Sequence, residues 1–386
     1  MKLTSRILVT ALTTAVLASA STAVLATDLK VGFISSLSGP ISALGIPYEK
    51  GIRVAAVTHM TIAGQKVQLI VMDDASDPST AARNARKLVS EDKVDVLIGT
   101  SGVPGAMAIA AVARETKTPL ISPTPVTLPG DEGLWTVTVS QPFPLMVSAV
   151  VERMKRSGVK TVAYIGFSDA LGDLAYDSLV KAAEPAGIKI VANERYARSD
   201  SSVVGQVLKI VAARPDAVFA GNSGTPGALP YLALAERGYR GGIYGTHGLI
   251  NPDFVRVGGT AVEGLLVPSG PVMVADQLSA DNPVRRVATD FRAAYQRQYQ
   301  ALPSDAFAAY TYDAWLLFAD AAARAKGKGE PGTPQFRAAL YEALTQTREL
   351  VGTHGIYNFK PGDRYGLDER SRVMIKLEKG QWKLAP

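Results

Sequence analysis

Short apolar runs rich in β-branched residues recur along the chain, and stretches with a helical period of apolar positions separate them. The first set of runs is LKVGFI (29–34), KVQLIVM (66–72), VDVLIG (94–99) and PLIS (119–122). Between the second and third runs, Asp77 and Pro78 open an amphipathic stretch, which predicts a capped helix. Runs that alternate with helices in this way indicate βαβ units around a parallel sheet.

The alternation begins again near residue 143. The second set of runs is KTVAYIGF (160–167), IKIVANERY (188–196), DAVFAG (216–221), GGIYGT (241–246) and EGLLVP (263–268). After Pro271 two long helical patterns follow, and SRVMIKLEKGQWKL at the end predicts a strand pair. Ligands of open α/β sheets bind beyond the carboxyl ends of the strands. We therefore predict an α/β fold with two lobes whose strand ends face one another.

The first 26 residues are predicted to be a cleaved signal peptide. Lys2 and Arg6 precede the stretch ILVTALTTAVLASASTAVLA, which ends in small residues. A membrane anchor is the alternative, because the stretch is just long enough to span a bilayer. The chain has no cysteine, so it has neither disulfides nor a site for the acyl chain of a lipoprotein. We expect a mature protein in the periplasm that is not lipid-anchored.

Composition changes this picture little. The length suits two domains of ordinary size, and a hydrophobic content of 47% is ample for their cores. The formal net charge of +6 falls to +4 (6 − 2) when Lys2 and Arg6 are removed with the signal peptide. The charges are scattered, and no basic block with interleaved aromatic residues occurs, so nucleic acid is not an expected partner.

The common catalytic and cofactor motifs are missing. The sequence contains no Walker motif, no G-x-G-x-x-G after the first run and no H-E-x-x-H, so no cofactor or metal is expected. GTSGV and GNSGT resemble the nucleophile elbow of hydrolases but lack its final glycine. The chain has only three histidines to serve as a base. We expect a binding protein, with a hydrolase as the alternative.

The segment GTSGVPGAMAIAAVA follows a strand and leads directly into a helix. Thr100, Ser101 and Gly102 are therefore predicted to lie at the amino end of that helix. Free amide N–H groups and the helix dipole make such an end suitable for a carboxylate. The alternative is that Ser101 only caps the helix.

Six blocks of sequence resemble one family in order and approximate spacing. They are VGFISSLSGPISALG, DDASDPSTAARNARKLVSEDKVDVLIGTSG, PLISPTPVT, YIGFSDALGD, GNSGTPGALP and GYRGGIYGTHGLINPDFVRVGG. The chain is similar, over essentially its whole mature length, to the periplasmic solute-binding proteins related to the leucine/isoleucine/valine-binding protein. These are the type I receptors of ABC importers. The resemblance implies two Rossmann-like lobes joined by three crossovers, with a ligand cleft that closes by hinge motion.

The lobe bounds follow from the restart and the resemblance. We assign residues 27–142 and 270–350 to lobe 1, and residues 143–269 and 351–386 to lobe 2. In members that bind amino acids, the loop matching Thr100 to Gly102 takes the ligand carboxylate. The resemblance further implies that the loop SPTPVT, with Thr124, and a glutamate from lobe 2 hold the ammonium group.

Two positions depart from that ammonium site. Val126 stands where the hydroxyl is expected, and His247 stands where the glutamate is expected. A buried ammonium without an anionic partner is costly, so these departures argue against an α-amino acid. Leu44 and Leu171 stand where aromatic residues commonly wall the pocket, and they leave an apolar slot for a ring or chain of the ligand.

His247 is expected to project into the cleft and to bond a polar group at the far end of the ligand, with a protonation state tunable near neutral pH. The alternative is a histidine that only braces its own loop. Ser223 and Thr225 in GNSGTPG are predicted to form a second helix start that donates to the same group. A tight turn with a cap is the alternative. Tyr310, in YTYDAW, is expected in the core.

We therefore expect a monomeric periplasmic receptor that captures a small carboxylate and delivers it to a membrane ABC permease. The segments SGTPGALP and THGLINPDF look like those of members that serve aromatic acids, so an aromatic monocarboxylate is the first choice. An aliphatic mono- or dicarboxylate and a branched-chain amino acid are the alternatives. A ligand sensor or hydrolase on the same two lobes is a more remote one.

Overall fold

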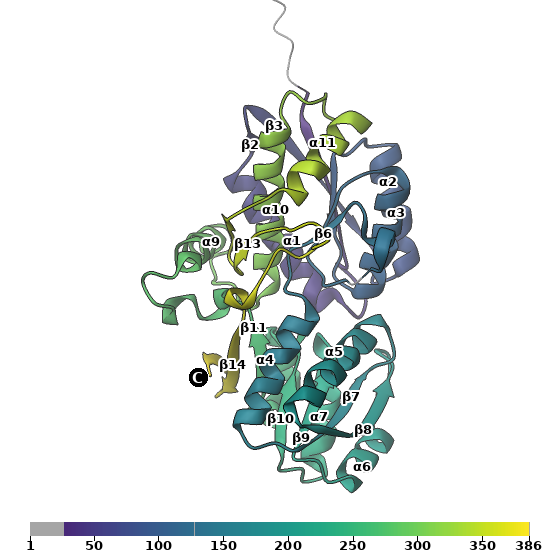
Figure 1. Cartoon of the computed structure of the whole chain (residues 1–386), viewed down its shortest axis with the longest axis vertical. Helices are drawn as coiled ribbons and strands as arrows, with labels where there is room; N and C mark the ends of the chain where they lie inside the picture. The colour runs from purple at the N-terminus through teal and green to yellow at the C-terminus, as the bar shows by residue number, and fades with distance from the viewer. Residues whose placement is uncertain (1–26, 127, 386) are drawn as a thin grey trace, which may run out of the picture.

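The computed structural model describes residues 27–126 and 128–385. Two lobes lie end to end along the long axis of the molecule, each built on its own β-sheet (Figure 1). We call the part on the six-stranded sheet lobe 1 and the part on the seven-stranded sheet lobe 2. The predicted signal peptide lies outside the described residues. Within residues 27–126 and 128–385, no helix has the length and apolarity needed to cross a membrane.

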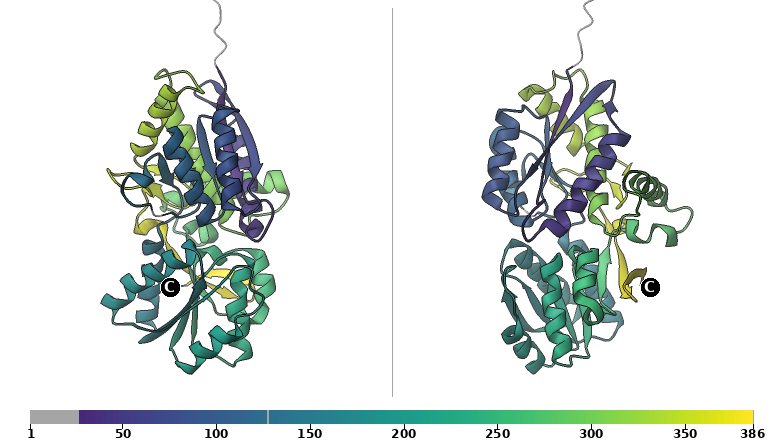
Figure 2. Two further views of the ribbon diagram at one scale, coloured as in Figure 1. Left: turned by 90° about the vertical axis from the view of Figure 1, so that its right-hand side faces the viewer. Right: turned by 180° about the vertical axis from the view of Figure 1, so that it is seen from behind.

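Lobe 1 is a sheet covered by helices on both faces. The strand order is β2-β3-β1-β4-β5-β6, and every neighbouring pair is parallel except β2 with β3. The strands are β1 (Leu29–Ser35), β2 (Thr61–Ile62), β3 (Gln65–Asp73), β4 (Val96–Gly99), β5 (Leu120–Ser122) and β6 (Thr136–Thr138). The helices are α1 (Ser42–Thr58), α2 (Pro78–Ser90), α3 (Val103–Thr116), α10 (Phe307–Ala325) and α11 (Pro334–Thr345). Helices α2 and α3 cover one face, and α1 and α10 cover the other (Figures 1 and 2).

Lobe 2 repeats this plan with a longer sheet, in the order β15-β14-β11-β10-β9-β7-β8. Strands β7 to β11 are parallel, whereas β14 and β15 pair antiparallel at one edge. The strands are β7 (Thr161–Phe167), β8 (Lys189–Tyr196), β9 (Ala217–Gly221), β10 (Gly242–Gly245), β11 (Leu266–Ser269), β14 (Val373–Glu378) and β15 (Gln381–Leu384). The helices are α4 (Phe143–Arg156), α5 (Ala170–Ala186), α6 (Val204–Ala212), α7 (Leu229–Glu236) and α8 (Pro252–Gly258).

The local predictions from the sequence are confirmed where the apolar pattern is long. The Asp77 side chain accepts a hydrogen bond from the amide of Thr80 at 2.7 Å, with Pro78 in the first turn of α2. The predicted C-terminal strand pair is the antiparallel pair β14 and β15. Four short strands were not predicted, because two or three residues are too few to show an alternating pattern of apolar and polar positions. They are the two-residue strands β2, β12 (Leu350–Val351) and β13 (Ile356–Tyr357) and the three-residue strand β6.

The chain passes between the lobes three times, after β6, after β11 and before β14, as the resemblance implied. The crossovers are hydrogen-bonded to one another. The Gln141 side chain donates to the carbonyl of Ser371 at 2.7 Å and accepts from the Tyr310 hydroxyl at 2.6 Å. Helix α9 (Pro283–Tyr299) follows the second crossover and lies beside the two lobes (Figure 1). The residue bounds of the lobes stay a prediction.

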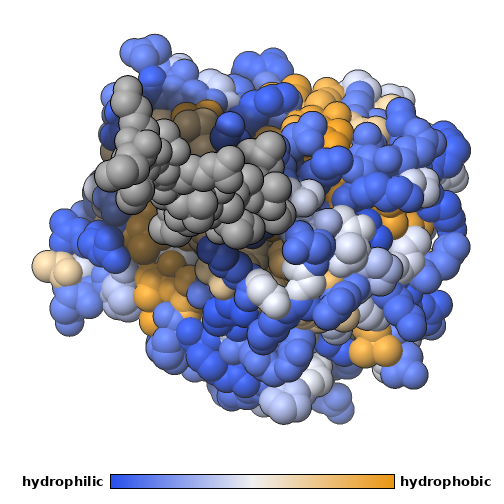
Figure 3. Space-filling view, turned by 90° about the horizontal axis from the view of Figure 1, so that it is seen from above, coloured by the Kyte–Doolittle hydropathy of each residue, from blue (hydrophilic) through white to orange (hydrophobic). Residues whose placement is uncertain are grey.

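The apolar side chains of both lobes are gathered inside. One continuous cluster of buried residues runs through both lobes, and a second lies between the first sheet and helices α2 and α3. Seen from the end of lobe 1, the surface that is not hidden by grey atoms is mainly hydrophilic, with separate hydrophobic spots (Figure 3). The parallel strands of both sheets direct their carboxyl ends to the boundary between the lobes, which is where a ligand site is expected.

Candidate ligand-binding site

A cavity of about 340 Å³, here called the inner cavity, lies between the lobes beyond the strand ends. Lobe 1 lines it with Leu44, Tyr48, Ser101, Pro123, Thr124, Pro125, Phe307 and Tyr310. The first crossover and lobe 2 line it with Ser140, Phe143, Leu171, Ser223, His247 and Gly248. The part of it that admits the centre of a water molecule is only about 20 Å³, so a larger ligand fits only when the lining moves apart.

Four aromatic rings, those of Tyr48, Phe143, Phe307 and Tyr310, contribute to the walls of the inner cavity. Tyr48 and Phe307 meet edge to face with ring centroids 5.6 Å apart, and Phe143 closes the cavity from α4. The predicted Leu44 and Leu171 both line it. Tyr310 is buried in the core, as predicted, and one side of it also faces the cavity. Sequence reasoning missed the other three rings, because each comes from a different helix and no motif joins them.

The start of α3 faces this boundary without a side-chain cap. Gly102 is the N-cap residue, and Ser101 does not cap the helix. Instead, the Ser101 hydroxyl accepts from the amide of Ser36 at 3.0 Å and lies 2.9 Å from the Ser35 hydroxyl. No hydrogen bond from the amide of Ser101 or Gly102 is found within the described part of the chain. These two N–H groups are therefore available to an anion.

Thr100 and Gly102 line a neighbouring space of about 430 Å³, here called the side cavity. The Thr100 hydroxyl donates to a carboxylate oxygen of Asp74, so this side chain is already engaged. Asp169 and Arg198 of lobe 2 line the same cavity. The loop from Thr100 to Gly102 thus separates the inner cavity, which Ser101 lines, from the side cavity.

The polar groups of the loop after β5 are already hydrogen-bonded within the protein. Thr124 lines the inner cavity, but its hydroxyl donates to the carbonyl of Thr100 at 2.5 Å and its carbonyl accepts from the Ser122 hydroxyl at 2.7 Å. The carbonyl of Pro123 accepts from the Tyr48 hydroxyl at 3.1 Å. The structure does not bring Val126 to the cavity. Its side chain is buried in the core.

His247 faces the inner cavity from the 3-10 turn η3 (His247–Leu249) and is only 5% exposed. Its Nδ1 atom is buried without a hydrogen-bond partner in the described structure. The ring packs on Phe143, with centroids 5.2 Å apart. Burial lowers the pKa of His247 to about 4, so the expectation of a charge tunable near neutral pH is wrong for the ligand-free protein. The imidazole is neutral at pH 7.

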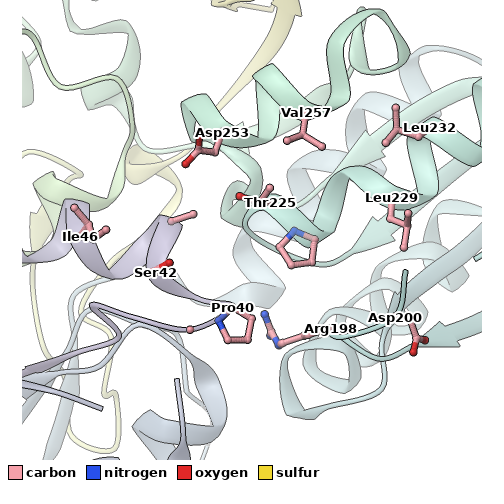
Figure 4. A pocket seen from close by; sticks show the side chains of 13 residues that line it. Pro40, Ser42, Ile46, Arg198, Asp200, Thr225, Leu229, Leu232, Asp253 and Val257 are labelled. Atoms are coloured by element: carbon pink, nitrogen blue, oxygen red, sulfur yellow. The ribbon is translucent and has the colours of Figure 1, made fainter. Parts of the chain in front are cut away.

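Ser223 and Thr225 do not face the same space. Ser223 lines the inner cavity, whereas Thr225 lines a more open cavity of about 940 Å³, here called the outer cavity (Figure 4). Thr225 begins the 3-10 turn η2 (Thr225–Ala228), which leads into α7. The Gly224 amide donates to the carbonyl of Gly248 at 2.9 Å. The Ser223 hydroxyl keeps its proton for a ligand, because it accepts from Arg198 Nη1 at 3.2 Å.

The inner cavity has donors and no anion. Its lining includes no Asp or Glu, and the Ser140 hydroxyl is a further buried polar group without a partner in the described residues. Across residues 27–126 and 128–385, no group of three or more His, Cys, Asp or Glu side chains could hold a metal. Within that same part of the chain, no serine hydroxyl is hydrogen-bonded to a histidine ring. The arrangement suits the binding of a mainly apolar anion.

Comparison with known proteins places this chain in a family. The sequence profile of the family described as "Periplasmic binding protein" matches residues 28–363, so the chain belongs to that family. The crystal structure of a leucine binding protein from Thermotoga maritima shares this fold, with a TM-score of 0.79 at 25% identity over 93% of this chain and 98% of its own.

Three proteins illustrate how similar its relatives are. "Leu/Ile/Val-binding protein BraC3" of Rhizobium johnstonii is 26% identical over 96% of this chain and 97% of its own. "Leu/Ile/Val-binding protein homolog 3" of Brucella melitensis is 28% identical over 62% of this chain, and the match spans 66% of that protein. The crystal structure of an extracellular ligand-binding receptor from Rhodopseudomonas palustris HaA2 is 40% identical. It covers 93% of this chain and 100% of its own, with a TM-score of 0.90.

Proposed function

We propose that this chain is a periplasmic receptor that captures a small carboxylate, most favourably an aromatic monocarboxylate, and delivers it to a membrane ABC permease. One observation carries the proposal. Ser101, directly before the uncapped start of α3, lines a mainly apolar cavity whose lining includes no Asp or Glu. An anion is favoured there by free amides and the helix dipole, and an ammonium group inside this cavity finds no carboxylate in its lining.

The ligand would bind with its ends toward different lobes. The amides of Ser101 and Gly102 in lobe 1 take the carboxylate, and a ring packs among Tyr48, Phe143 and Phe307. The neutral His247 and the Ser223 hydroxyl then serve a polar group at the far end, such as a phenol. Each lobe contacts the ligand, and some of these contacts form only when the lobes are closed. The free energy of these contacts stabilises the closed arrangement relative to the open one. Closure also presents one composite surface to the permease.

The second candidate function is uptake of a branched-chain amino acid or an aliphatic carboxylate. The names of two relatives favour it, since both are called Leu/Ile/Val-binding proteins. Against an amino acid stands His247 in place of a glutamate, because a neutral imidazole does not balance the charge of an ammonium group. A sensor or hydrolase on the same fold is the remote alternative. The proposed location rests on the predicted signal peptide, and a monomer fits delivery to a permease.

Calorimetric titration tests the proposal. The protein is first unfolded and refolded, so that any solute retained from purification is removed. The probes are 4-hydroxybenzoate, L-leucine and 4-methylpentanoate, which is leucine without its amino group. We expect 4-hydroxybenzoate to bind most tightly, and 4-methylpentanoate to bind at least about tenfold more tightly than leucine, because a buried unpaired ammonium is costly. Tight leucine binding with no binding of either acid would overturn the proposal and support the second candidate.

A further inference from the structure

Arg198 is a cation at the ligand cleft that the sequence did not reveal. It follows β8 in lobe 2 and lines both the outer and the side cavity. Of the residues that line the inner, side and outer cavities in the described structure, it is the only lysine or arginine. Figure 4 shows its guanidinium pointing from lobe 2 toward Pro40 of lobe 1. The side chain therefore lies where the two lobes face one another.

The guanidinium is held in one orientation by three contacts. Arg198 Nε donates to Asp169 Oδ2 at 2.6 Å, and Nη1 donates to the Ser223 hydroxyl at 3.2 Å. The guanidinium carbon lies 4.0 Å from the centroid of the Phe167 ring. The third nitrogen, Nη2, is buried and has no partner in the described residues. A buried donor without an acceptor is unfavourable, so an oriented cation with an unused donor indicates a missing acceptor.

Asp169 neutralises the positive charge of Arg198 only in part. Its other carboxylate oxygen, Oδ1, accepts from the amides of Leu171 at 3.0 Å and Gly172 at 3.2 Å at the start of α5. The Asp169 carboxylate is thus shared between the helix start and the guanidinium. The remaining charge of Arg198 can act on a ligand, because a helix start already stabilises the negative charge of its partner.

An anion near the start of α3 needs this cation. Asp74 and Asp77 line the side cavity together with Asp169, on the same side of the loop as Thr100 and Gly102. Carboxylates on this side repel an incoming anion, and Arg198 is the group that opposes them. It faces the same cavity as Thr100 and Gly102, but from the other lobe.

We propose that Arg198 is a specificity-determining residue, which supplies from lobe 2 the positive charge that recognises the ligand carboxylate held at the start of α3 in lobe 1. This inference rests on the proposed function. It explains how closure depends on the ligand charge. The carboxylate is shared between the lobes only when they approach, and a neutral isostere gains much less from closure.

The test measures the binding of two ligands to three variants. The ligands are 4-hydroxybenzoate and its neutral isostere 4-hydroxybenzamide, and the variants are Arg198→Gln, Arg198→Lys and Arg195→Gln. Arg195 is a matched control, because it is also an arginine of the β8 segment with an ion pair, to Asp173 at 3.1 Å, and it lines none of the three cavities. Calorimetry gives each dissociation constant, and circular dichroism confirms that each variant is folded.

We expect Arg198→Gln to weaken binding of the acid about 10- to 100-fold and binding of the amide by less than about threefold. Arg195→Gln leaves both unchanged, and Arg198→Lys recovers part of the loss. Equal weakening of acid and amide, or no recovery by lysine, would show that Arg198 only braces Ser223. An unchanged acid affinity in Arg198→Gln also overturns the inference. If the wild-type protein binds neither 4-hydroxybenzoate nor 4-methylpentanoate, the proposed function itself fails.

Discussion

The Ser101 hydroxyl accepts a hydrogen bond from the amide of Ser36 at 3.0 Å, and this contact decides what the start of α3 can do. A serine before a helix usually caps it with its side chain. Here the hydroxyl instead joins the loop after β4 to the end of β1, and the N-cap position falls to Gly102. The helix start therefore keeps free amides, and the serine that was predicted to touch the ligand is also a structural tie.

Ser101→Ala removes this tie. The Ser36 amide then loses its acceptor in a buried place, so the free energy of unfolding should fall by about 1–2 kcal/mol. The affinity for a carboxylate should change by less than about threefold, because the backbone amides remain. Urea unfolding and calorimetry measure the two effects. Ser90→Ala, at an exposed end of α2, is the control. A large loss of affinity at unchanged stability would mean that the hydroxyl itself holds the ligand.

Gly224→Ala tests the approach of the lobes. A Cβ on Gly224 of lobe 2 would lie 2.9 Å from Leu44 Cδ1 of lobe 1, and the glycine has a φ of +64°. The backbone of Gly224, with φ +64° and ψ −166°, lies in a region that glycine almost alone adopts, so the variant loses about 1–3 kcal/mol of stability, and the added methyl hinders closure. We expect ligand affinity to fall about tenfold, since closure becomes costlier.

Gly187→Ala separates these two effects. Gly187 ends α5 with a φ of +72°, and nothing lies within 4 Å of an added Cβ. Its ordinary left-handed backbone, with ψ 28°, should cost an alanine only about 1 kcal/mol of stability, and the variant should keep full ligand affinity. If both variants bind equally well, the contact between Leu44 and Gly224 plays no part in closure.

His247 should make the ligand-free protein less stable in acid. Its pKa is lowered to about 4 in the folded protein from an ordinary value of 6.5, so the unfolded chain binds more protons between these values. The contribution of His247 to stability is complete above pH 6.5 and is lost as the pH falls toward 4. Asp313 acts in the opposite direction, because burial raises its pKa to about 6 and its penalty disappears on protonation.

The variant His247→Gln isolates the histidine. Between pH 7 and pH 4.5, its free energy of unfolding should fall by roughly 2 kcal/mol less than that of the wild type. Urea unfolding at the two pH values measures this difference. An equal fall in both proteins would mean that His247 is not buried in its neutral form.

The pH dependence of binding distinguishes two classes of ligand. A neutral His247 can bond a phenol without taking up a proton, so the dissociation constant for 4-hydroxybenzoate should vary by less than about twofold between pH 6 and pH 8. A dicarboxylate such as terephthalate would bring an anion to the ring and raise its pKa. Its binding should then tighten as the pH falls through this range. Calorimetry in buffers of different ionisation enthalpy would show the proton uptake.

The architecture could be predicted from the sequence because its strands and helices are long enough to carry a period. The restart near residue 143 separated the two sheets, and the blocks of resemblance implied the three crossovers. The loop from Thr100 to Gly102 was placed at the cleft because the strand ends of parallel sheets gather at one edge. Leu44 and His247 were assigned to the cleft by the family resemblance.

The details of the site depend on burial and on contacts between distant segments, which a sequence pattern does not carry. The neutral state of His247 follows from its burial, not from its neighbours in sequence. Arg198 is one of many scattered arginines until Asp169 and Ser223 are seen to orient it. Phe143 opens a helix and reads as an ordinary core residue, yet its ring packs on His247. Val126 is buried in the core and does not line the inner cavity.

The crystal structure of the complex with 4-hydroxybenzoate tests the central claim most directly. The account predicts a carboxylate oxygen within hydrogen-bond distance, about 3 Å, of the amide nitrogens of Ser101 and Gly102, with the ring in the inner cavity and the phenol toward His247. A ligand bound the other way round, with its carboxylate at His247 and its ring against the start of α3, would contradict it. So would a ligand that leaves both amides in contact with solvent.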